Sequence, residues 1–175
     1  MKNGTKKIRR VAVLGSGTAK EKDPAYQQAV KLGKALAEAN LTVYHGGYGG
    51  VMEAVARGCR SANGRNVGVT IGKSLSRANA WADAEIKKPS WKERLFELIE
   101  MGDAYVFLEG ATGTLNELFF VWEMTNKKLL KKPIILVGKR LNRLVALLKK
   151  DPALKIPSDF YLASSVGQVI QLLRR

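Results

Sequence analysis

Short apolar runs alternate along the chain with longer segments in which apolar residues recur every three or four positions. Runs of four to six apolar residues closed by glycine predict buried strands, and the periodic segments predict helices. The predicted strands are residues 11–14, 41–45, 66–71, 104–108 and 133–137, before a short final strand and helix. This alternation predicts an α/β fold, a single doubly wound domain with a mainly parallel sheet covered on both faces.

The helices are expected between these strands. The first runs from Pro24 to about residue 40, and the second from Val51 to a stop near residue 58 or 63. Ser90 is the predicted cap of a third helix through residue 101, and further helices are predicted over residues 115–128 and 141–149. Residues 73–90 show no clear period, so we expect an irregular loop over the site that could act as a lid.

Glycine-rich turns follow four of the predicted strands. They are Gly15-Ser16-Gly17, Gly46-Gly47, Gly72 and the turn from Gly110 to Thr114. Ligands of open parallel sheets bind beyond the carboxyl ends of the strands, so these turns are expected to converge on one crevice. The last turn opens a helix, and helix N-termini favour anions. The pattern therefore predicts a phosphate site.

Glu117 stands one helical turn beyond this predicted anion site. It can be interpreted in two ways that do not exclude each other. Thr114-x-x-Glu117 fits a capping box, in which the glutamate only bonds back to the helix start. Alternatively, the carboxylate acts on the ligand. The spacing alone does not separate a cap from a functional carboxylate.

Arg94 lies inside an apolar stripe formed by Trp91, Leu95 and Leu98. Because these positions share one helix face, the guanidinium is directed toward the protein and needs an anion. A structural ion pair with Glu97 or Glu100 would satisfy it, as would a side chain that snorkels at the edge of the stripe. Since the helix leads straight into the strand at residues 104–108, a role in the site is the functional alternative.

The length of 175 residues suits one domain. We expect a basic N-terminal arm (residues 1–10) followed by a Rossmann-like nucleotide-binding domain (residues 11–175). The chain contains 30 lysines and arginines against 15 acidic residues. This excess would attract polyanions, but it is concentrated in the arm and in residues 127–155. No aromatic-interleaved module is visible, so nucleic-acid binding is possible but less favoured.

Without an apolar run near eighteen residues or a signal-peptide pattern, we expect a cytoplasmic protein that does not bind membranes.

Several common chemistries are disfavoured. The first turn lacks a complete G-x-G-x-x-G, and no acidic residue ends the second strand, which argues against a dinucleotide dehydrogenase. A Walker-type phosphate loop is absent from the sequence. His45 is the sole histidine and Cys59 the sole cysteine, so neither a metal cluster nor a cofactor is expected. We interpret His45 as a strand-end residue bonded to the backbone and Cys59 as a partly buried spectator.

These motifs resemble the LOG-type family, the phosphoribohydrolases that activate cytokinins and are often mislabelled as lysine decarboxylases. Members carry a glycine-serine turn like Gly15-Ser16, a paired-glycine turn like Gly46-Gly47, and an arginine, here Arg94, before P-G-G-x-G-T-x-x-E. In this chain Gly110, Gly113, Thr114 and Glu117 match that motif, whereas Glu109 replaces its proline and Ala111 its second glycine. Glu109 places a negative charge beside the expected phosphate, which would weaken phosphate binding unless a basic residue offsets it.

The resemblance implies hydrolysis of the N-glycosidic bond of a nucleoside 5′-monophosphate. It implies Arg94 and Glu117 as the catalytic residues. The residues implied to bind phosphate or nucleotide are Gly15, Ser16, Gly46, Gly47, Gly110, Thr112, Gly113 and Thr114. No lysine is identified for a pyridoxal phosphate Schiff base, so the decarboxylase label fits poorly.

Two alternatives remain open. The segment Gly46-Gly47-x-Gly-Gly50-Val-Met-Glu-Ala-Val also resembles molybdenum-cofactor carriers, which would make the protein a non-catalytic carrier. A single-stranded nucleic-acid module, as in DNA-processing proteins of similar fold, is the other. Family members commonly form homodimers, and Phe119, Phe120 and Trp122 cover more than one helix face, as a dimer interface would require.

Overall fold

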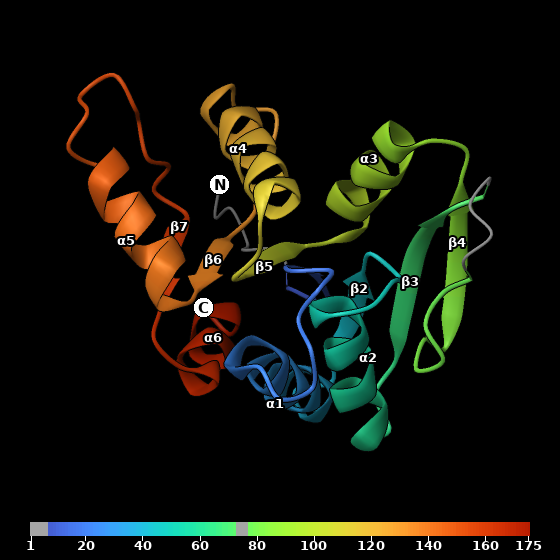
Figure 1. The fold of residues 1–175 in the computed structure, drawn as a ribbon. Coiled ribbons are helices and arrows are strands. Elements are labelled where there is room, and N and C mark those ends of the chain that lie inside the picture. The colour runs from blue at the N-terminus through green and yellow to red at the C-terminus, as the bar shows by residue number, and fades with distance from the viewer. Residues whose placement is uncertain (1–6, 73–76) are drawn as a thin grey trace.

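The structure is a computed structural model that describes residues 7–72 and 77–175. Within these residues, strands and helices alternate along the chain (Figure 1). In chain order they are β1 (Arg10–Leu14), α1 (Pro24–Glu38), β2 (Thr42–His45), α2 (Val51–Ser61), β3 (Asn66–Ile71), β4 (Ala84–Lys88), α3 (Trp91–Met101), β5 (Ala104–Leu108), α4 (Thr112–Asn126), β6 (Ile134–Val137), α5 (Lys139–Leu148), β7 (Phe160–Ala163) and α6 (Val166–Leu173).

All strands join one parallel sheet in the order β4-β3-β2-β1-β5-β6-β7. Val11 of β1 pairs with Val43 on one side and Ala104 on the other. The direction in which successive strands are added therefore reverses between β1 and β5. In open α/β sheets such a reversal leaves a crevice beyond the carboxyl ends of the two strands. The predicted doubly wound fold is confirmed.

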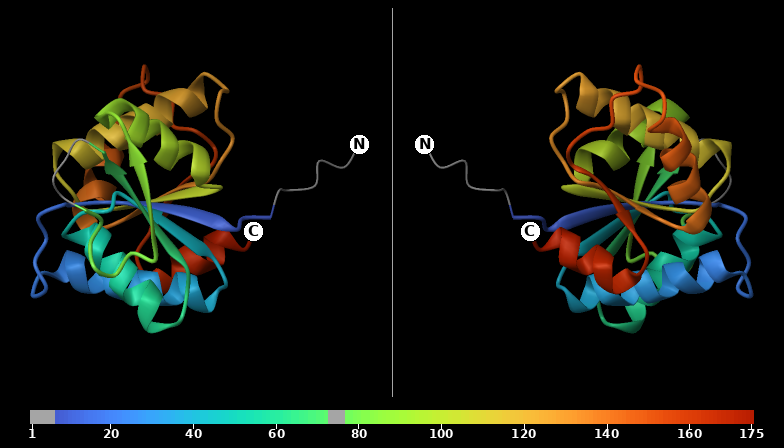
Figure 2. Two further views of the ribbon diagram at one scale, coloured as in Figure 1. Left: turned by 90° about the vertical axis from the view of Figure 1, so that its right-hand side faces the viewer. Right: turned by 90° about the vertical axis from the view of Figure 1, so that its left-hand side faces the viewer.

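Two apolar cores lie on opposite faces of the sheet (Figure 2). Helices α1, α2 and α6 cover one face, where Leu32, Val55 and Val169 are fully buried. The other face is covered by α3, α4 and α5. Because the central strands are buried on both faces, β1 and β5 are continuous apolar runs, which is why they were visible in the sequence.

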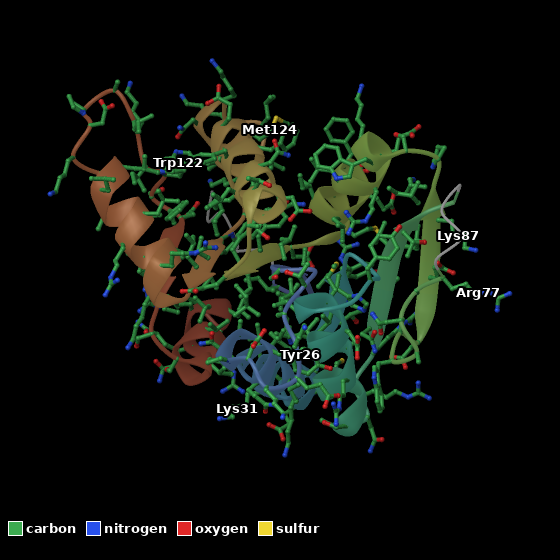
Figure 3. The ribbon with its side chains drawn as sticks, viewed as in Figure 1. Tyr26, Lys31, Arg77, Lys87, Trp122 and Met124 are labelled. Carbon is green, nitrogen blue, oxygen red and sulfur yellow. The ribbon has the colours of Figure 1, made fainter. Side chains whose placement is uncertain are left out.

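The loop predicted over residues 73–90 is wrong for its second half. Residues 73–76 lie outside the described residues, but Ala84–Lys88 form the edge strand β4, which pairs with β3 through Val69 and Ile86. An edge strand with exposed residues has no continuous apolar run, so its sequence lacked the strand signal. Figure 3 shows Arg77 and Lys87 pointing away from the protein at this edge.

The predicted arm, residues 1–10, lies mostly outside the described residues, and Arg10 is already part of β1. Lys31 on α1 also points outward, as expected of a solvated basic face (Figure 3). No helix in the described part of the chain is both long and apolar enough to cross a bilayer.

Candidate functional site

A cavity of about 330 Å³ opens at the carboxyl ends of the central strands. Seven of the ten predicted site residues line it, and they come from four separate segments. These residues are Gly15, Ser16, Gly46, Arg94, Gly113, Thr114 and Glu117. The reversal of strand order between β1 and β5 thus brings the first turn beside the last one, as the topology requires.

Arg94 is buried under the turn that follows β2. Its Nε donates to the carbonyl oxygen of Val69 at 2.8 Å, and its Nη2 donates to that of Gly46 at 2.9 Å. Any side chain at Gly46 would overlap the guanidinium, so this close approach requires glycine. Burial lowers the pKa of Arg94 from its usual value, but an arginine stays charged in proteins. The site therefore contains a fixed, buried cation.

The carboxylate partner of Arg94 within the described residues is Glu117, and not Glu97 or Glu100, which were the candidates for a purely structural ion pair. Glu97 instead accepts a hydrogen bond from Lys88 at 2.8 Å. Oε1 of Glu117 lies 4.0 Å from Nη1 of Arg94, and only 12% of the Glu117 side chain is exposed. The two groups attract one another, but the gap is too long for a hydrogen bond.

Burial raises the pKa of Glu117 to about 7, although the nearby Arg94 charge opposes this rise. Near neutral pH the carboxyl group is thus divided between its protonated and ionised forms. A group with such a pKa is well suited to proton transfer, and its ionised form can stabilise a developing positive charge.

The capping-box interpretation of Thr114 and Glu117 is wrong. Helix α4 begins at Thr112 with Ala111 at the N-cap, so Thr114 is already inside the helix. No side chain of the described residues caps this helix, although the first N–H groups of any helix lack partners within it. Ala111, Gly113 and Thr114 line the cavity, which exposes this positive helix end to a ligand.

The structure does not bring Gly47, Gly110 and Thr112 to the cavity wall. Gly47 has a φ of 80°, and its N–H donates to Nδ1 of His45. Gly110 packs under the helix start, where a side chain would overlap Thr114. These two glycines shape the turns, and Thr112 is exposed as the first residue of α4.

Glu109, the residue that departs from the family motif, is paired with Arg140 at the start of α5. Its Oε1 accepts the Arg140 backbone N–H at 2.7 Å, and the Arg140 guanidinium donates to the carbonyl oxygen of Gly110. Glu109 is thus held by a backbone N–H at the start of α5, while the positive charge of Arg140 lies at the carbonyl oxygen of the next residue, Gly110. Glu109 and Arg140 are 31 positions apart in the sequence, so this contact could not be found by sequence reasoning.

Sequence reasoning missed several apolar residues of the cavity, including Tyr48, Met52 and Ile71. It also assigned Trp91 to an inward stripe, whereas 47% of this residue is exposed and it lines the cavity. The i, i+3 spacing from Arg94 was the signal that could have placed Trp91 there. It was interpreted as core packing because tryptophan in a helix stripe is usually buried.

His45 and Cys59 are structural residues. His45 bonds through Nε2 to Asn66 at 2.9 Å, and burial lowers its pKa to about 4. Cys59 is completely buried, not partly as expected. Among residues 7–72 and 77–175, no three His, Cys, Asp or Glu side chains are grouped so that they could hold a metal ion.

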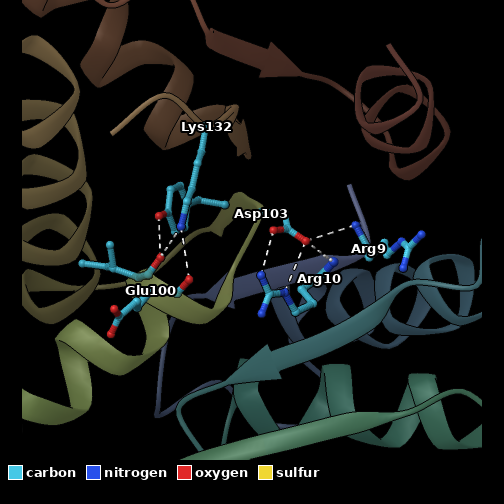
Figure 4. Close-up of polar contacts among 7 residues, drawn as sticks. Arg9, Arg10, Glu100, Asp103 and Lys132 are labelled. Carbon is cyan, nitrogen blue, oxygen red and sulfur yellow. Dashed lines mark hydrogen bonds and ion pairs between the residues drawn. The ribbon is translucent and has the colours of Figure 1, made fainter. Parts of the chain in front are cut away.

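A second hollow, of about 660 Å³, lies at the amino ends of the strands and is lined by Lys7, Arg9, Arg10, Thr42, Tyr44, Arg65 and Asp103. Asp103 is tightly bonded there (Figure 4). Its Oδ2 accepts the backbone N–H groups of Arg9 and Arg10, and its Oδ1 accepts Nη2 of Arg10 at 3.0 Å. Lys132 nearby donates to the carbonyl oxygens of Ile99 and Glu100, which closes the end of α3.

The fold and the cavity define a Rossmann-like α/β protein with an uncapped helix N-terminus beside a buried arginine and glutamate. The chain belongs to the SLOG cluster4 family, whose family model matches residues 8–166. The resemblance to LOG-type proteins inferred from the motifs is thereby confirmed.

Three similar proteins illustrate the range of this relationship. An uncharacterized protein of Archaeoglobus fulgidus is 29% identical over 136 residues, covering 77% of this chain and 88% of that protein. The cytokinin riboside 5′-monophosphate phosphoribohydrolase LOG of Oryza sativa is 35% identical over 137 residues, which cover 75% of this chain but 56% of the rice protein. The chain thus spans about half the length of this relative.

The third is the molybdenum cofactor binding protein of Rippkaea orientalis. Its structure superposes with a TM-score of 0.76 at 22% identity and covers 97% of both chains. At this identity the likeness establishes a shared fold.

Proposed function

We propose that this protein hydrolyses the N-glycosidic bond of a nucleoside 5′-monophosphate, releasing the free base and ribose 5-phosphate. The observation that carries the proposal is the pairing of buried Arg94 and Glu117 at 4.0 Å in a cavity that also exposes the start of α4. The similarity to the rice phosphoribohydrolase supports the same reaction class.

The phosphate would bind at the N-terminus of α4. Gly113 and Thr114 line the cavity from the start of α4, and Ser16 lines it from the turn after β1. Ser16 is held there because its N–H donates to the carbonyl oxygen of Glu109 and its own carbonyl oxygen accepts the N–H of Val51. A dianionic phosphate would gain both hydrogen bonds and the favourable helix dipole.

The reaction would break the bond between C1′ of the sugar and the base nitrogen. The bonding electrons leave with the base, which takes up a proton, while positive charge develops on the sugar ring. Ionised Glu117 stabilises that charge and orients the water that adds to C1′; this water gives up one proton, which balances the proton taken up by the base. Arg94, fixed by its two carbonyl partners, positions the ligand and holds Glu117 in place.

The test is incubation of the purified protein with a panel of nucleoside 5′-monophosphates, assaying free base and ribose 5-phosphate. Glu117→Gln is the control, because it keeps the shape of the side chain and removes its charge. We expect release by the wild type alone, with nucleotide binding retained by the variant. Equal release by both proteins would refute the role of Glu117.

A non-catalytic carrier of a nucleotide or a molybdenum cofactor is the second candidate. The departures at Glu109 and Ala111 favour it, as they change the turn next to the expected phosphate. A carrier would be stabilised against heat by nucleotide or by the pterin cofactor without releasing base. Base release that depends on Glu117 would exclude the carrier as the sole function.

We also propose a homodimer formed through the outer faces of α3 and α4. Phe96 and Phe119 are 39% and 43% exposed there, and Phe96 packs against Phe120 with ring centroids 5.5 Å apart. Light scattering after size-exclusion chromatography should give twice the mass of one chain. A monomer at micromolar concentration would contradict this proposal.

A further inference from the structure

The hollow of about 660 Å³ lies at the opposite edge of the sheet from the cavity that contains Arg94 and Glu117. Four of its seven lining residues are basic and one, Asp103, is acidic. The basic residues are Lys7, Arg9, Arg10 and Arg65. Pockets that bind small molecules commonly measure about 300–1,000 Å³, so the hollow has the size of a ligand site.

The hollow crosses four neighbouring strands at their amino ends. The N–H of Asp103, just before β5, donates to the carbonyl oxygen of Arg10 in β1. Arg10 pairs in turn with Thr42 of β2, and the N–H of Val43 donates to the carbonyl oxygen of Arg65, just before β3. Neighbouring strands are about 4.8 Å apart, so the backbones of Arg10 and Arg65 are separated by roughly 10 Å. The positive charges therefore form a row along the edge.

The negative groups near this row already have partners. Asp103 accepts hydrogen bonds from Arg9 and Arg10, and only 7% of its side chain is exposed. The carboxyl end of α3 would also attract cations. Its carbonyl oxygens at Ile99 and Glu100 accept hydrogen bonds from Lys132. Neither the carboxylate nor the helix end accounts for the remaining basic residues of the hollow.

Lys7, Arg9 and Arg65 have no countercharge in the described part of the chain. No acidic side chain in residues 7–72 and 77–175 lies within ion-pair distance of these three cations, and all three residues are exposed. The Arg9 side chain extends away from Asp103 (Figure 4). Like charges around one hollow repel each other, so a bound anion would relieve the repulsion and accept charge-assisted hydrogen bonds.

The shape of the row indicates which anion fits. A single phosphate group would meet only part of a row that spans three strands, whereas linked phosphate groups place negative charges along it. Tyr44 is the aromatic residue among the described lining residues, and it is only 8% exposed. Proteins that bind single-stranded nucleic acids usually offer exposed rings on which bases stack. The hollow is thus suited to a phosphate chain and offers little to a base.

We propose that this hollow is a second binding site, which takes an oligophosphate, either free or as the triphosphate group of a nucleotide. Arg9 and Arg65 contact the phosphate groups from β1 and from the start of β3. Arg10 adds positive charge between them while it stays bonded to Asp103. The site is separate from the cavity at the carboxyl ends of the strands and does not depend on the hydrolase activity proposed for that cavity.

The test is a titration of the isotope-labelled protein with tripolyphosphate, followed by backbone amide NMR signals. The signals of Thr42 and Tyr44, at the hollow, should shift and saturate. Shifts confined to Gly113 and Thr114 would place the ligand at the other edge of the sheet and refute the proposal. An absence of any shift would refute it as well.

A double variant tests the arginines. Arg9→Gln with Arg65→Gln should raise the Kd obtained from the two hollow signals about tenfold. Arg77→Gln with Arg143→Gln is the matched control, since it removes the same charge from exposed positions outside the hollow. The control should bind like the wild type, and an equal loss in both double variants would show that only the overall charge matters. Urea unfolding should show that both variants fold as the wild type does.

Other ligands define the class. ATP and tripolyphosphate carry the same phosphate chain, so tighter ATP binding at the hollow would identify a nucleoside triphosphate, and tighter tripolyphosphate binding a free oligophosphate. Inorganic phosphate that binds as tightly as tripolyphosphate would refute the proposed class. Binding of a short oligothymidine at these signals, without binding of tripolyphosphate, would replace the proposal with a nucleic-acid surface.

The two proposed sites can fail separately. Base release should be the same in the wild type and in the Arg9→Gln, Arg65→Gln variant, because neither arginine lines the carboxyl-edge cavity. Tripolyphosphate binding at the hollow without any base release would support the second site and refute the hydrolase. Base release without binding at the hollow would do the reverse.

Discussion

The two edges of the sheet each hold an arginine beside a carboxylate, but in opposite arrangements. At the amino edge, Arg10 and Asp103 are joined at 3.0 Å, and the Arg10 side chain is 36% exposed. At the carboxyl edge, Arg94 and Glu117 are 4.0 Å apart, with 8% and 12% of their side chains exposed. The hydrogen bond to Asp103 raises the pKa of Arg10, whereas burial lowers the pKa of Arg94.

This difference separates a structural pair from a candidate chemical one. The Asp103 carboxylate accepts hydrogen bonds from Arg9 and Arg10, and these bonds hold the start of β1 against β5. Its negative charge therefore stabilises the fold. Glu117 is desolvated without a hydrogen bond from its partner, which is unfavourable in the ligand-free protein. Ionisable groups kept in such a state in a cavity are characteristic of functional sites.

The largest effect is expected from Arg94→Ala. Removing the guanidinium leaves two carbonyl oxygens without their donor and a buried carboxylate without its neighbouring positive charge, so base release should fall about 1000-fold and the free energy of unfolding by about 3 kcal/mol. Arg94→Lys keeps the charge but cannot bond both carbonyl groups in the same geometry. Initial rates and urea unfolding measure these effects, and near-normal rates in both variants would show that the pair is only structural.

The pH dependence of stability should distinguish Glu117 from the other carboxylates. Its pKa is about 7 in the folded protein against 4.5 ordinarily, so the folded state holds this proton more tightly. Stability contributed by the protonated group is present below pH 4.5 and is lost as pH rises through 7, by about 3 kcal/mol.

Urea unfolding of wild type and Glu117→Gln across this range should show the wild type losing that stability relative to the variant. Glu123→Gln, at an exposed pair with Lys127, is the control and should follow the wild type. A constant difference between wild type and Glu117→Gln would contradict the raised pKa.

Asp103→Ala should affect stability and leave the chemistry intact. The change removes the acceptor of two backbone N–H groups and of the Arg10 guanidinium, which should lower the free energy of unfolding by about 2 kcal/mol. Base release per folded molecule should equal that of the wild type. If turnover fell as it does in Arg94→Ala, the two edges would not be functionally distinct.

The smallest effect is expected from Arg140→Ala. Removing the Arg140 guanidinium from the carbonyl oxygen of Gly110 takes a positive charge away from the region of Glu109 and the helix start, so ribose 5-phosphate should bind about fivefold more weakly, or ~1 kcal/mol. Calorimetry would measure this change. In a Glu109→Gln background the loss should be smaller, and an equal loss would show that Arg140 does not act by offsetting Glu109.

The sequence was informative where burial is continuous. The runs at β1 and β5 are buried on both faces, and their glycine turns mark the carboxyl edge, so the fold and the location of the cavity were predictable. Edge strand β4 was missed because its residues are half exposed and carry two lysines. The hydrophobic pattern of a segment reflects how deeply its residues are buried, and the residues of an edge strand are only partly buried.

The details of the site depended on contacts between distant residues. Arg94 was recognised from its helix face, but its partner Glu117 lies 23 positions further along, and the spacing did not separate a helix cap from a functional carboxylate. The start of α4 was placed at Leu115 because the apolar period begins there, although the helix starts at Thr112. Pairings such as Glu109 with Arg140 carry no local signal, since only the sheet brings those segments together.

The most direct measurement is base release from the panel of nucleoside 5′-monophosphates by wild type, Glu117→Gln and Asp103→Asn in parallel, with binding measured for each. The account predicts release by the wild type and by Asp103→Asn, and nucleotide binding without release by Glu117→Gln. Release by Glu117→Gln at the wild-type rate, or no release by any of the three proteins, would contradict it.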